Sequence, residues 1–304
     1  EYALSGEKGG VACKTEADLF KALGLAEIPP ELREDAGEIE AAEKGKLPKL
    51  VTLDDVTGTF HCHTSLADGG SDGENTLKEM AEAARAMGLS YLGIADHSQS
   101  LKMAGGLTVE RVRAQWKKID ALNEKLGGKF RVFKGTECDI LADGSLDFPD
   151  EVLAGFDYVV ASVHTNFRMD RDEMTARIIR AVSNPYVTML GHPTGRLLLS
   201  RDQYAVDLDA VIDAAAKAGT MIEINANPHR LDLDAVHCRR AVQKGVRIVI
   251  NPDAHSTGGL HDISYGVSVA RRAWMTAADL VNTGSIDEVT RELERLRSRA
   301  KSHG

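Results

Sequence analysis

Residues 58–97 read GTFHCHTSLADGGSDGENTLKEMAEAARAMGLSYLGIADH, and this stretch holds the unit from which the fold is predicted. An apolar run at 58–63 precedes a helical pattern at 75–88, and a second apolar run follows at 91–97. Parallel strands need a crossover connection of this kind, which is usually a helix. The stretch therefore predicts two parallel strands joined by a helix, with ligand-type residues where each strand ends.

The same alternation continues along the chain. Further β-rich apolar runs occupy residues 131–140, 158–164, 187–193, 220–227 and 247–255, with helical patterns between most of them. Seven such runs within about 200 residues favour a closed, seven-stranded (β/α) barrel. An open parallel sheet is the alternative that the pattern alone leaves.

The first part of the chain, residues 1–56, differs in composition from the rest. Residues 15–23 (TEADLFKAL) predict a short helix that begins with a capping box. A Pro-Pro pair ends this segment, and the charged residues 31–50 predict small surface helices. We expect residues 1–56 to form a small helical extension and residues 57–304 to form one α/β domain.

Composition narrows the class of protein. The chain has 304 residues, of which 43% are hydrophobic and 27% charged, as is ordinary for a soluble globular enzyme. Its net charge of −9 argues against histone-like binding of nucleic acid, but permits a local basic groove or an acidic site neutralised by metal. No apolar window approaches the ~20 residues of a membrane span. We expect a cytoplasmic protein without a membrane partner, whose four cysteines are reduced.

Residues that bind metals gather at the predicted strand ends. Six of the seven runs carry His, Asp or Glu at or near the C-terminal end, in the strings HCH, ADH, TECD, SVH, GHP and PDAH. In a β/α barrel these ends share one face, where active sites are built. Converging imidazoles and carboxylates would be costly to desolvate unless metal ions compensated them. Nitrogen and oxygen donors without thiolate suit Zn, Mn or Fe.

The spacing of these residues also has a geometric meaning. His61 and His63 lie two apart, so both project from one side of a strand while Cys62 points to the opposite layer. The strings at 137–139 and 253–255 repeat this spacing. About nine ligands suit two or three ions, and neighbouring ions suit the hydrolysis of a phosphoester.

These motifs resemble those of the PHP (polymerase and histidinol phosphatase) family, where they occur in the same order. The resemblance is closest to the C-terminal PHP domain of bacterial family X DNA polymerases and covers nearly all of residues 15–304. It rests on the strings GTFHCHT, YLGIADHS, TECDILADGSLDF, YVVASVH, MLGHPTGRLLL, EINANPHRLDL and INPDAHST. It implies a distorted seven-stranded barrel with a trinuclear metal site. Residues 1–56 then resemble the end of a polymerase thumb plus a linker, and the catalytic aspartates of a polymerase palm are absent from the sequence.

The resemblance also implies a set of metal ligands. These are His61, His63, His97, Glu137, His164, His192, Asp253 and His255, with Asp68 or Asp72 as the ninth. Asp68 keeps the spacing from HCHT, whereas Asp72 keeps the Ser-Asp-Gly string and the spacing to the next helix; we favour Asp72. Thr59 stands where many members of the family have Asp, which predicts weaker support for a ligand histidine.

The activity implied by the resemblance is that of a metal-dependent phosphoesterase acting on DNA ends. We expect a 3′–5′ exonuclease that also processes abasic sites or 3′-phosphates, supported by Mn and using a metal-bound hydroxide. Glu137, His192 and Asp253 are the candidate catalytic residues, with Glu137 bridging two ions.

Two arginines are candidates for binding the substrate phosphate. Arg196 and Arg230 follow strand ends, where a guanidinium suits a phosphate; ion pairs with loop carboxylates are the alternative for both. A histidinol-phosphate type of small-molecule phosphatase and a non-catalytic scaffold of a polymerase are the alternative functions. The expected partners are DNA ends or a small phosphoester, and the polymerase domain of a longer parent protein.

Overall fold

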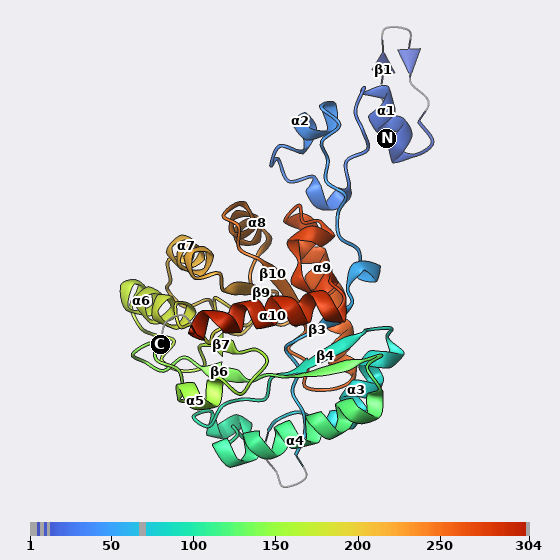
Figure 1. The fold of residues 1–304 in the computed structure, drawn as a ribbon. Coiled ribbons are helices and arrows are strands. Elements are labelled where there is room, and N and C mark those ends of the chain that lie inside the picture. The colour runs from blue at the N-terminus through green and yellow to red at the C-terminus, as the bar shows by residue number, and fades with distance from the viewer. Residues whose placement is uncertain (1–4, 7–8, 11–12, 67–70, 302–304) are drawn as a thin grey trace.

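The strands of the main body are parallel, as the alternation of apolar runs and helical patterns predicts. The computed structural model describes residues 5–6, 9–10, 13–66 and 71–301. Five strands hydrogen-bond in the order β10-β9-β8-β7-β6 and three in the order β3-β4-β5, and every neighbouring pair in these two sheets is parallel. Helices surround these strands (Figure 1).

Each predicted apolar run contains a short strand. The strands are β3 (Gly58–Thr59), β4 (Tyr91–Ile94), β5 (Arg131–Lys134), β6 (Glu137–Asp139), β7 (Val160–Ser162), β8 (Met189–Leu190), β9 (Met221–Asn225) and β10 (Ile248–Asn251). The ring of Tyr158 reaches between two of them. Its hydroxyl lies within hydrogen-bonding reach of two carbonyl groups, that of Phe60 just beyond β3 and that of Ile94 at the end of β4. Its single hydrogen is shared between these two acceptors.

The predicted seven-stranded barrel is only partly confirmed. The hydrogen-bonded ladders give eight parallel strands in two sheets rather than one ring of seven. The extra strand arises because the predicted run 131–140 is interrupted at Gly135 and forms both β5 and β6. Tyr158 fills the space beside Gly135, where an added Cβ would lie 2.1 Å from the ring. Isolated bridges between Cys62 and Ala254 and between His97 and Glu137 link the two sheets.

The five helical patterns noted between the apolar runs are confirmed. They form α3 (Leu77–Ala86), α4 (Val109–Leu126), α6 (Arg171–Val182), α7 (Leu208–Ala218) and α8 (Ala235–Gln243). The residue before each helix accepts a hydrogen bond from a backbone N–H three residues on, as N-caps do; these caps are Thr76, Thr108, Asp170, Asp207 and Asp234. No helix in the described part of the chain has the length and apolarity needed to cross a membrane.

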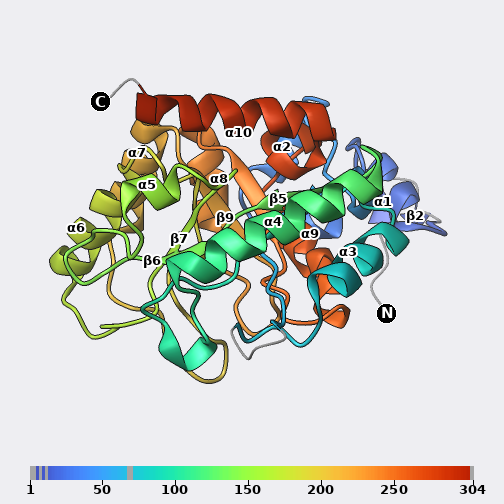
Figure 2. The ribbon, with the colours of Figure 1, turned by 60° about the horizontal axis from the view of Figure 1, so that its bottom comes forward.

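The last helices complete the body. They are the short α5 (Asp150–Leu153), then α9 (Ile263–Arg272) and α10 (Ile286–Lys301). The charged string RELERLRSRAK at residues 291–301 is typical of a solvated helix, but one face of α10 is buried. Val289, Leu293 and Leu296 are buried in a cluster with the rings of Phe60 and Tyr91. Figure 2 shows α10 lying across the strands at the top, away from the loops below.

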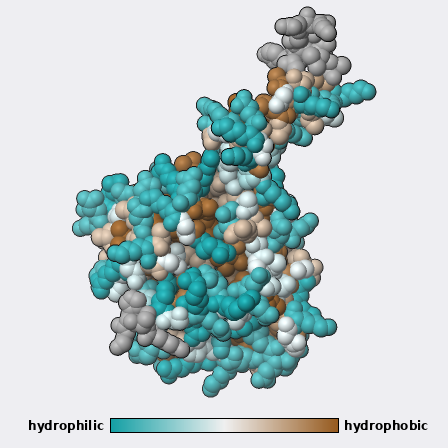
Figure 3. All heavy atoms as spheres, turned by 45° about the horizontal axis from the view of Figure 1, so that its top comes forward, coloured by the Kyte–Doolittle hydropathy of each residue, from teal (hydrophilic) through white to brown (hydrophobic). Residues whose placement is uncertain are grey.

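The N-terminal extension projects from this body (Figures 1 and 3). It contains β1 (Ser5–Gly6), β2 (Gly9–Gly10), α1 (Glu16–Ala22) and α2 (Glu38–Glu43). The predicted capping box of α1 is present. An ion pair of 2.7 Å between Glu31 and Arg271 ties the extension to α9. A small apolar cluster around Ile28 and Leu32 adds packing.

Candidate metal centre

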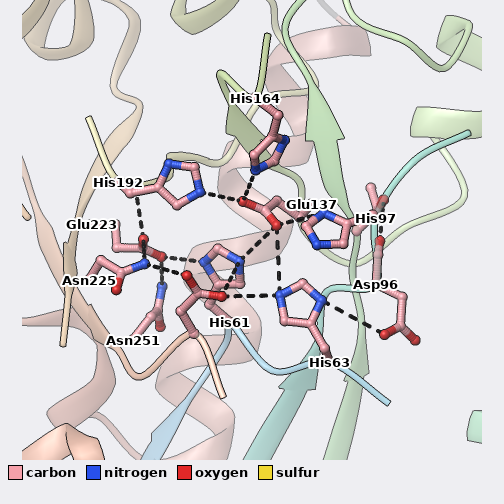
Figure 4. Close-up of polar contacts among 12 residues, drawn as sticks. His61, His63, Asp96, His97, Glu137, His164, His192, Glu223, Asn225 and Asn251 are labelled. Carbon is pink, nitrogen blue, oxygen red and sulfur yellow. Dashed lines mark hydrogen bonds and ion pairs between the residues drawn. The ribbon is translucent and has the colours of Figure 1, made fainter. Parts of the chain in front are cut away.

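Nine of the predicted ligands lie together at the C-terminal ends of the strands and in the loops that follow. Three groups have ligand atoms that all lie within 4.8 Å of one another: His63, Asp72, His97 and His255; His61, His63 and Asp253; and His97, Glu137 and His164. Figure 4 shows most of these side chains converging. The alternative ligand Asp68 lies outside the described residues.

Glu137 stands at the middle of the centre. Its Oε1 lies 2.7 Å from His192 Nε2 and 3.1 Å from His164 Nε2. Its Oε2 lies 2.9 Å from His97 Nδ1 and 3.2 Å from His61 Nε2. The two oxygens therefore face different pairs of imidazoles, which suits a carboxylate that binds one ion with each oxygen.

Asp72 serves the more open side of the centre. Its Oδ2 lies 3.3 Å from His255 Nε2 and 3.5 Å from His97 Nε2, and its Oδ1 lies 3.8 Å from His63 Nδ1. The side chains of Asp72 and His255 are 32% and 37% exposed, whereas those of His61 and His63 are fully buried. Solvent therefore reaches the centre from the side of Asp72 and His255.

Asp253, just beyond the end of β10, belongs to the group of His61 and His63. Its Oδ1 lies 3.3 Å from His63 Nε2 and 3.6 Å from His61 Nε2. Its Oδ2 accepts a hydrogen bond of 3.0 Å from Asn225 and lies 3.2 Å from Arg230 Nε. One oxygen thus faces imidazoles, while the other is held by the protein.

The residues fit divalent metal ions. Several buried imidazole nitrogens have no hydrogen-bond partner among the described residues: His61 Nε2, both nitrogens of His63, His97 Nδ1 and His192 Nδ1. An unpaired buried nitrogen is costly, and a bound cation removes that cost. The donors are imidazole nitrogens and carboxylate oxygens, the set that Zn, Mn and Fe accept. Cys62 packs in an apolar cluster instead.

Carboxylates raise the pKa of four ligand histidines, which are His61, His97, His164 and His255. Burial lowers the pKa of His61, but Glu223 and Glu137 outweigh that effect and raise it well above its ordinary value. For His97, Glu137 and Asp72 similarly overcome burial and raise the pKa to about 10. At neutral pH both imidazoles hold a proton that a metal ion must displace.

Two other histidines are shifted the opposite way. Burial and then the Arg230 guanidinium lower the pKa of His192 to about 4. Burial, followed by the charges of His255 and His97, lowers the pKa of His63. Both imidazoles are therefore neutral at physiological pH, which is the form that binds a metal ion.

Glu223 on β9 is a supporting residue to which the sequence analysis gave no role. Its Oε2 lies 2.7 Å from His61 Nδ1 and accepts a bond of 2.8 Å from Asn251. Its Oε1 accepts bonds of 2.9 Å from the backbone N–H of His192 and 3.0 Å from Asn225. Four donors thus converge on one fully buried carboxylate. The available signal was the alternation of Glu223, Asn225 and Asn227 along one strand.

The support of the ligand histidine His61 does not come from Thr59, where many members of the family have Asp. The Thr59 hydroxyl lies 3.2 Å from both the backbone carbonyl of Ile250 and Asn251 Oδ1, and among the described residues it makes no hydrogen bond to a ligand histidine. Glu223 instead holds His61 from β9. Because a carboxylate only accepts, His61 carries its hydrogen on Nδ1 and presents Nε2 to the centre.

Two aspartates support the remaining side of the centre. Asp139 Oδ1 lies 2.5 Å from His164 Nδ1 and fixes that ring. Asp96 accepts hydrogen bonds from the Thr64 backbone N–H at 2.7 Å and from the Ser71 hydroxyl at 2.6 Å. Since Ser71 precedes Asp72, Asp96 also positions the loop that carries this ligand.

The two candidate phosphate-binding arginines occupy different settings. Arg196 donates through Nε to the backbone carbonyl of Arg230 at 2.8 Å and through Nη2 to that of Leu231. Its guanidinium therefore holds the neighbouring loop. Arg230 pairs with Asp253, and its buried Nη1 has no partner among the described residues. Phosphate binding stays a prediction for both.

Sequence relatives agree with this geometry. A model of the PHP domain matches residues 59–227. The DNA polymerase/3′-5′ exonuclease PolX of Bacillus subtilis (strain 168) is 42% identical over 281 residues, which make up 92% of this chain and 48% of that protein. A probable phosphatase of Acetivibrio thermocellus is 31% identical over 203 residues, or 64% of this chain and 78% of that protein. The chain thus spans about half the length of PolX.

A solved structure shares the fold. It is the histidinol phosphate phosphatase of Lactococcus lactis subsp. lactis, complexed with zinc, L-histidinol and phosphate. It matches with a TM-score of 0.53 and 18% identity, over 70% of this chain and 93% of that one. The PHP model covers more than half of this chain and includes six of the converging histidine and glutamate ligands. The chain therefore belongs to the PHP family of metal-dependent phosphoesterases.

Proposed function

We propose that this phosphoesterase acts on DNA ends, as a 3′–5′ exonuclease that also processes 3′-phosphates or abasic sites. The observation that carries the proposal is the 42% identity to PolX over 92% of the chain. Identity to two probable phosphatases is lower, at 28% and 31%, and extends over 84% and 64% of the chain. We therefore favour a DNA substrate, as the name of PolX indicates, over a small phosphomonoester.

The proposed cofactor is a set of two or three divalent ions, with Mn supporting activity. Such ions stabilise charge on the phosphoryl group and lower the pKa of a coordinated water. The nine ligands described above would hold them, and Glu137 would serve two ions because each of its oxygens faces different imidazoles.

The side chains near the centre favour direct attack by water. Cys62 and Cys138 are fully buried, and burial raises the pKa of Cys62 well above its ordinary value and that of Cys138 to about 12. Neither thiol supplies a thiolate at physiological pH. We therefore propose hydrolysis without a covalent intermediate on cysteine.

Arg230 is the proposed contact for the substrate phosphate. Its Nε is engaged by Asp253 at 3.2 Å, while its Nη1 is buried without a partner among the described residues. A phosphate oxygen would satisfy this donor and place the phosphorus beside the ligand Asp253. Arg230→Lys should therefore raise KM more than it lowers kcat.

A small-molecule phosphatase is the second candidate. The probable phosphatase TTE1963 of Caldanaerobacter subterraneus subsp. tengcongensis is matched over 96% of its own length, at 28% identity. A protein matched over nearly its whole length by this chain leaves little room for a polymerase half. This observation keeps histidinol phosphate among the substrates to be tested.

A parallel assay tests the proposal. The purified protein is given 3′-recessed duplex DNA, a 3′-phosphate oligonucleotide, an abasic duplex and histidinol phosphate, each with Mn, with Zn and with EDTA. An Asp253→Asn protein purified identically controls for contaminating nucleases. We expect metal-dependent processing of DNA that the variant lacks. Faster turnover of histidinol phosphate than of every DNA would support the second candidate, and no turnover by metal-loaded protein would support a scaffold.

A further inference from the structure

An exposed leucine hairpin stands on the loop between β8 and α7. Leu197 and Arg201 pair in an antiparallel bridge, and the chain turns between them. At the turn, Leu198 is 38% exposed and Leu199 is fully exposed. Leu199 also has a φ of +63°, a conformation that is unfavourable for a residue with a branched side chain. An exposed leucine in an unfavourable backbone conformation suggests a function at that position.

The hairpin is held firmly from below. Arg201 donates through Nε and Nη2 to the Gly195 carbonyl at 3.1 and 2.7 Å. The same guanidinium lies 4.0 Å from the centroid of the Phe167 ring. The backbone N–H of Leu198 donates to the His229 carbonyl at 2.6 Å. The leucines are therefore presented on a fixed support.

The hairpin lies beside the metal centre. It begins five residues after the ligand His192, on the same loop. Its hydrogen-bond partner His229 immediately precedes Arg230, whose Nε lies 3.2 Å from the ligand Asp253. The hairpin therefore belongs to the loops that border the centre next to Arg230 and Asp253.

Arginines lie at the base of the hairpin. Arg196 and Arg201 belong to the same loop, and Arg230 lies in the loop after β9 whose backbone bonds to it. Arg230 pairs with Asp253, and the buried carboxylate of Asp232 feels the charges of Arg196 and Arg230. This concentration of arginine contrasts with the net charge of −9 of the whole chain. The arginines suit a polyanion better than a basic or neutral partner.

We propose that the leucine hairpin, residues 197–201, contacts the terminal base of a nucleic-acid substrate while the arginines at its base attract the phosphates. Leucine side chains serve as apolar wedges against bases in other nucleic-acid complexes, and arginine is suited to phosphate. A small phosphomonoester would not reach both features. The inference rests on the proposed DNA-end activity and adds the residues that select nucleic acid over small phosphoesters.

Leu199→Gly is the decisive variant, because glycine adopts a positive φ freely and removes the side chain without disturbing the fold. Leu199→Ala supports it. Leu53→Ala is the matched control, since Leu53 is also an exposed leucine, at 51%, but precedes β3 at the other end of the strands. Thermal unfolding and metal content verify that each protein is folded and loaded.

The measurement is kcat/KM for 3′-recessed DNA and for bis(p-nitrophenyl) phosphate, a diester without a nucleobase, both with Mn. For both Leu199 variants we expect the ratio of the two values to fall about tenfold, mostly through KM for DNA, the size of one lost base contact. Leu53→Ala should keep the ratio of the parent protein.

Other results would overturn the inference. An unchanged ratio for Leu199→Gly would show that the hairpin does not contact DNA. An equal loss on both substrates would show that it shapes the metal centre instead. If the parent protein hydrolyses the small diester but no DNA, the proposed function fails, and the proposed role of the hairpin fails with it. This outcome is distinguishable because it is seen in the parent protein, before any variant is compared.

Discussion

Glu137 links the chemistry of single residues to the whole centre. Its Oε1 faces His164 and His192, and its Oε2 faces His61 and His97, so one carboxylate lies between four imidazoles. The imidazoles lower its pKa well below the ordinary value despite burial, so Glu137 is ionised. A neutral side chain of the same size would keep the volume but lose the charge and one oxygen.

Glu137→Gln is expected to lower the rate of phosphodiester hydrolysis by about 100-fold or more, because it weakens the binding of two ions at once. The apolar clusters behind the strands are untouched, so the variant should still fold and unfold cooperatively in EDTA. Near-normal turnover at saturating Mn would show that Glu137 does not bridge two metal ions.

Glu223→Gln tests support from behind the ligands. The two carboxylate oxygens accept four hydrogen bonds, so an amide NH₂ in either place would face two donors. We expect metal affinity, measured by titration calorimetry, to fall about 10- to 100-fold. Glu38→Gln is the matched control, because Glu38 is also buried but bonds only backbone N–H groups far from the centre. Equal affinities in both variants would refute the role of Glu223.

The pKa of His97 makes stability depend on pH and metal together. A pKa raised to about 10 stabilises the metal-free protein fully below about pH 6.5, and this contribution is lost as the pH rises towards 10. A bound metal replaces the proton, so the metal-loaded protein escapes that loss. The gap between the unfolding temperatures with Mn and with EDTA should therefore widen as the pH rises from about 6 to 9. A gap that narrows over this range would contradict the assignment.

At the scale of elements, α10 closes the end of the strands opposite the metal centre. Leu293 is 2% exposed and packs in the cluster that contains Phe60, Tyr91 and Tyr158. Leu293→Ala should lower the free energy of unfolding by about 2–5 kcal/mol, as measured by urea denaturation. Metal stoichiometry at low temperature should stay unchanged, and a loss of metal without a loss of stability would contradict this division of roles.

The periodicity of the sequence predicts most helices and strands, but not how the strands are divided between two sheets. Alternating runs and N-caps predict α3 and α4 to within a few residues, because both signals are local. The split of residues 131–140 depends on the ring of Tyr158, which is distant in sequence. The buried face of α10 was missed because RELERLRSRAK is dominated by charge, while its leucines meet strands from the whole chain.

At the scale of the molecule, the ligand set was more predictable than its support. Metal ligands must be His, Asp or Glu, so their types and strand-end positions are visible in sequence. Glu223 has the same chemistry but acts through His61, and only its hydrogen bonds to His61 and to Asn251 on β10 reveal that role. The hairpin at residues 197–201 is visible only through its exposure and backbone conformation.

The central claim is that strand ends from the whole chain build one multinuclear metal centre. Anomalous diffraction at the manganese and zinc edges, from crystals of protein reconstituted with each metal, tests it most directly. The account predicts two or three ions, one of them beside Asp72, His97 and His255, and Glu137 between two of them. A single ion, or ions bound away from these side chains after full reconstitution, would contradict it.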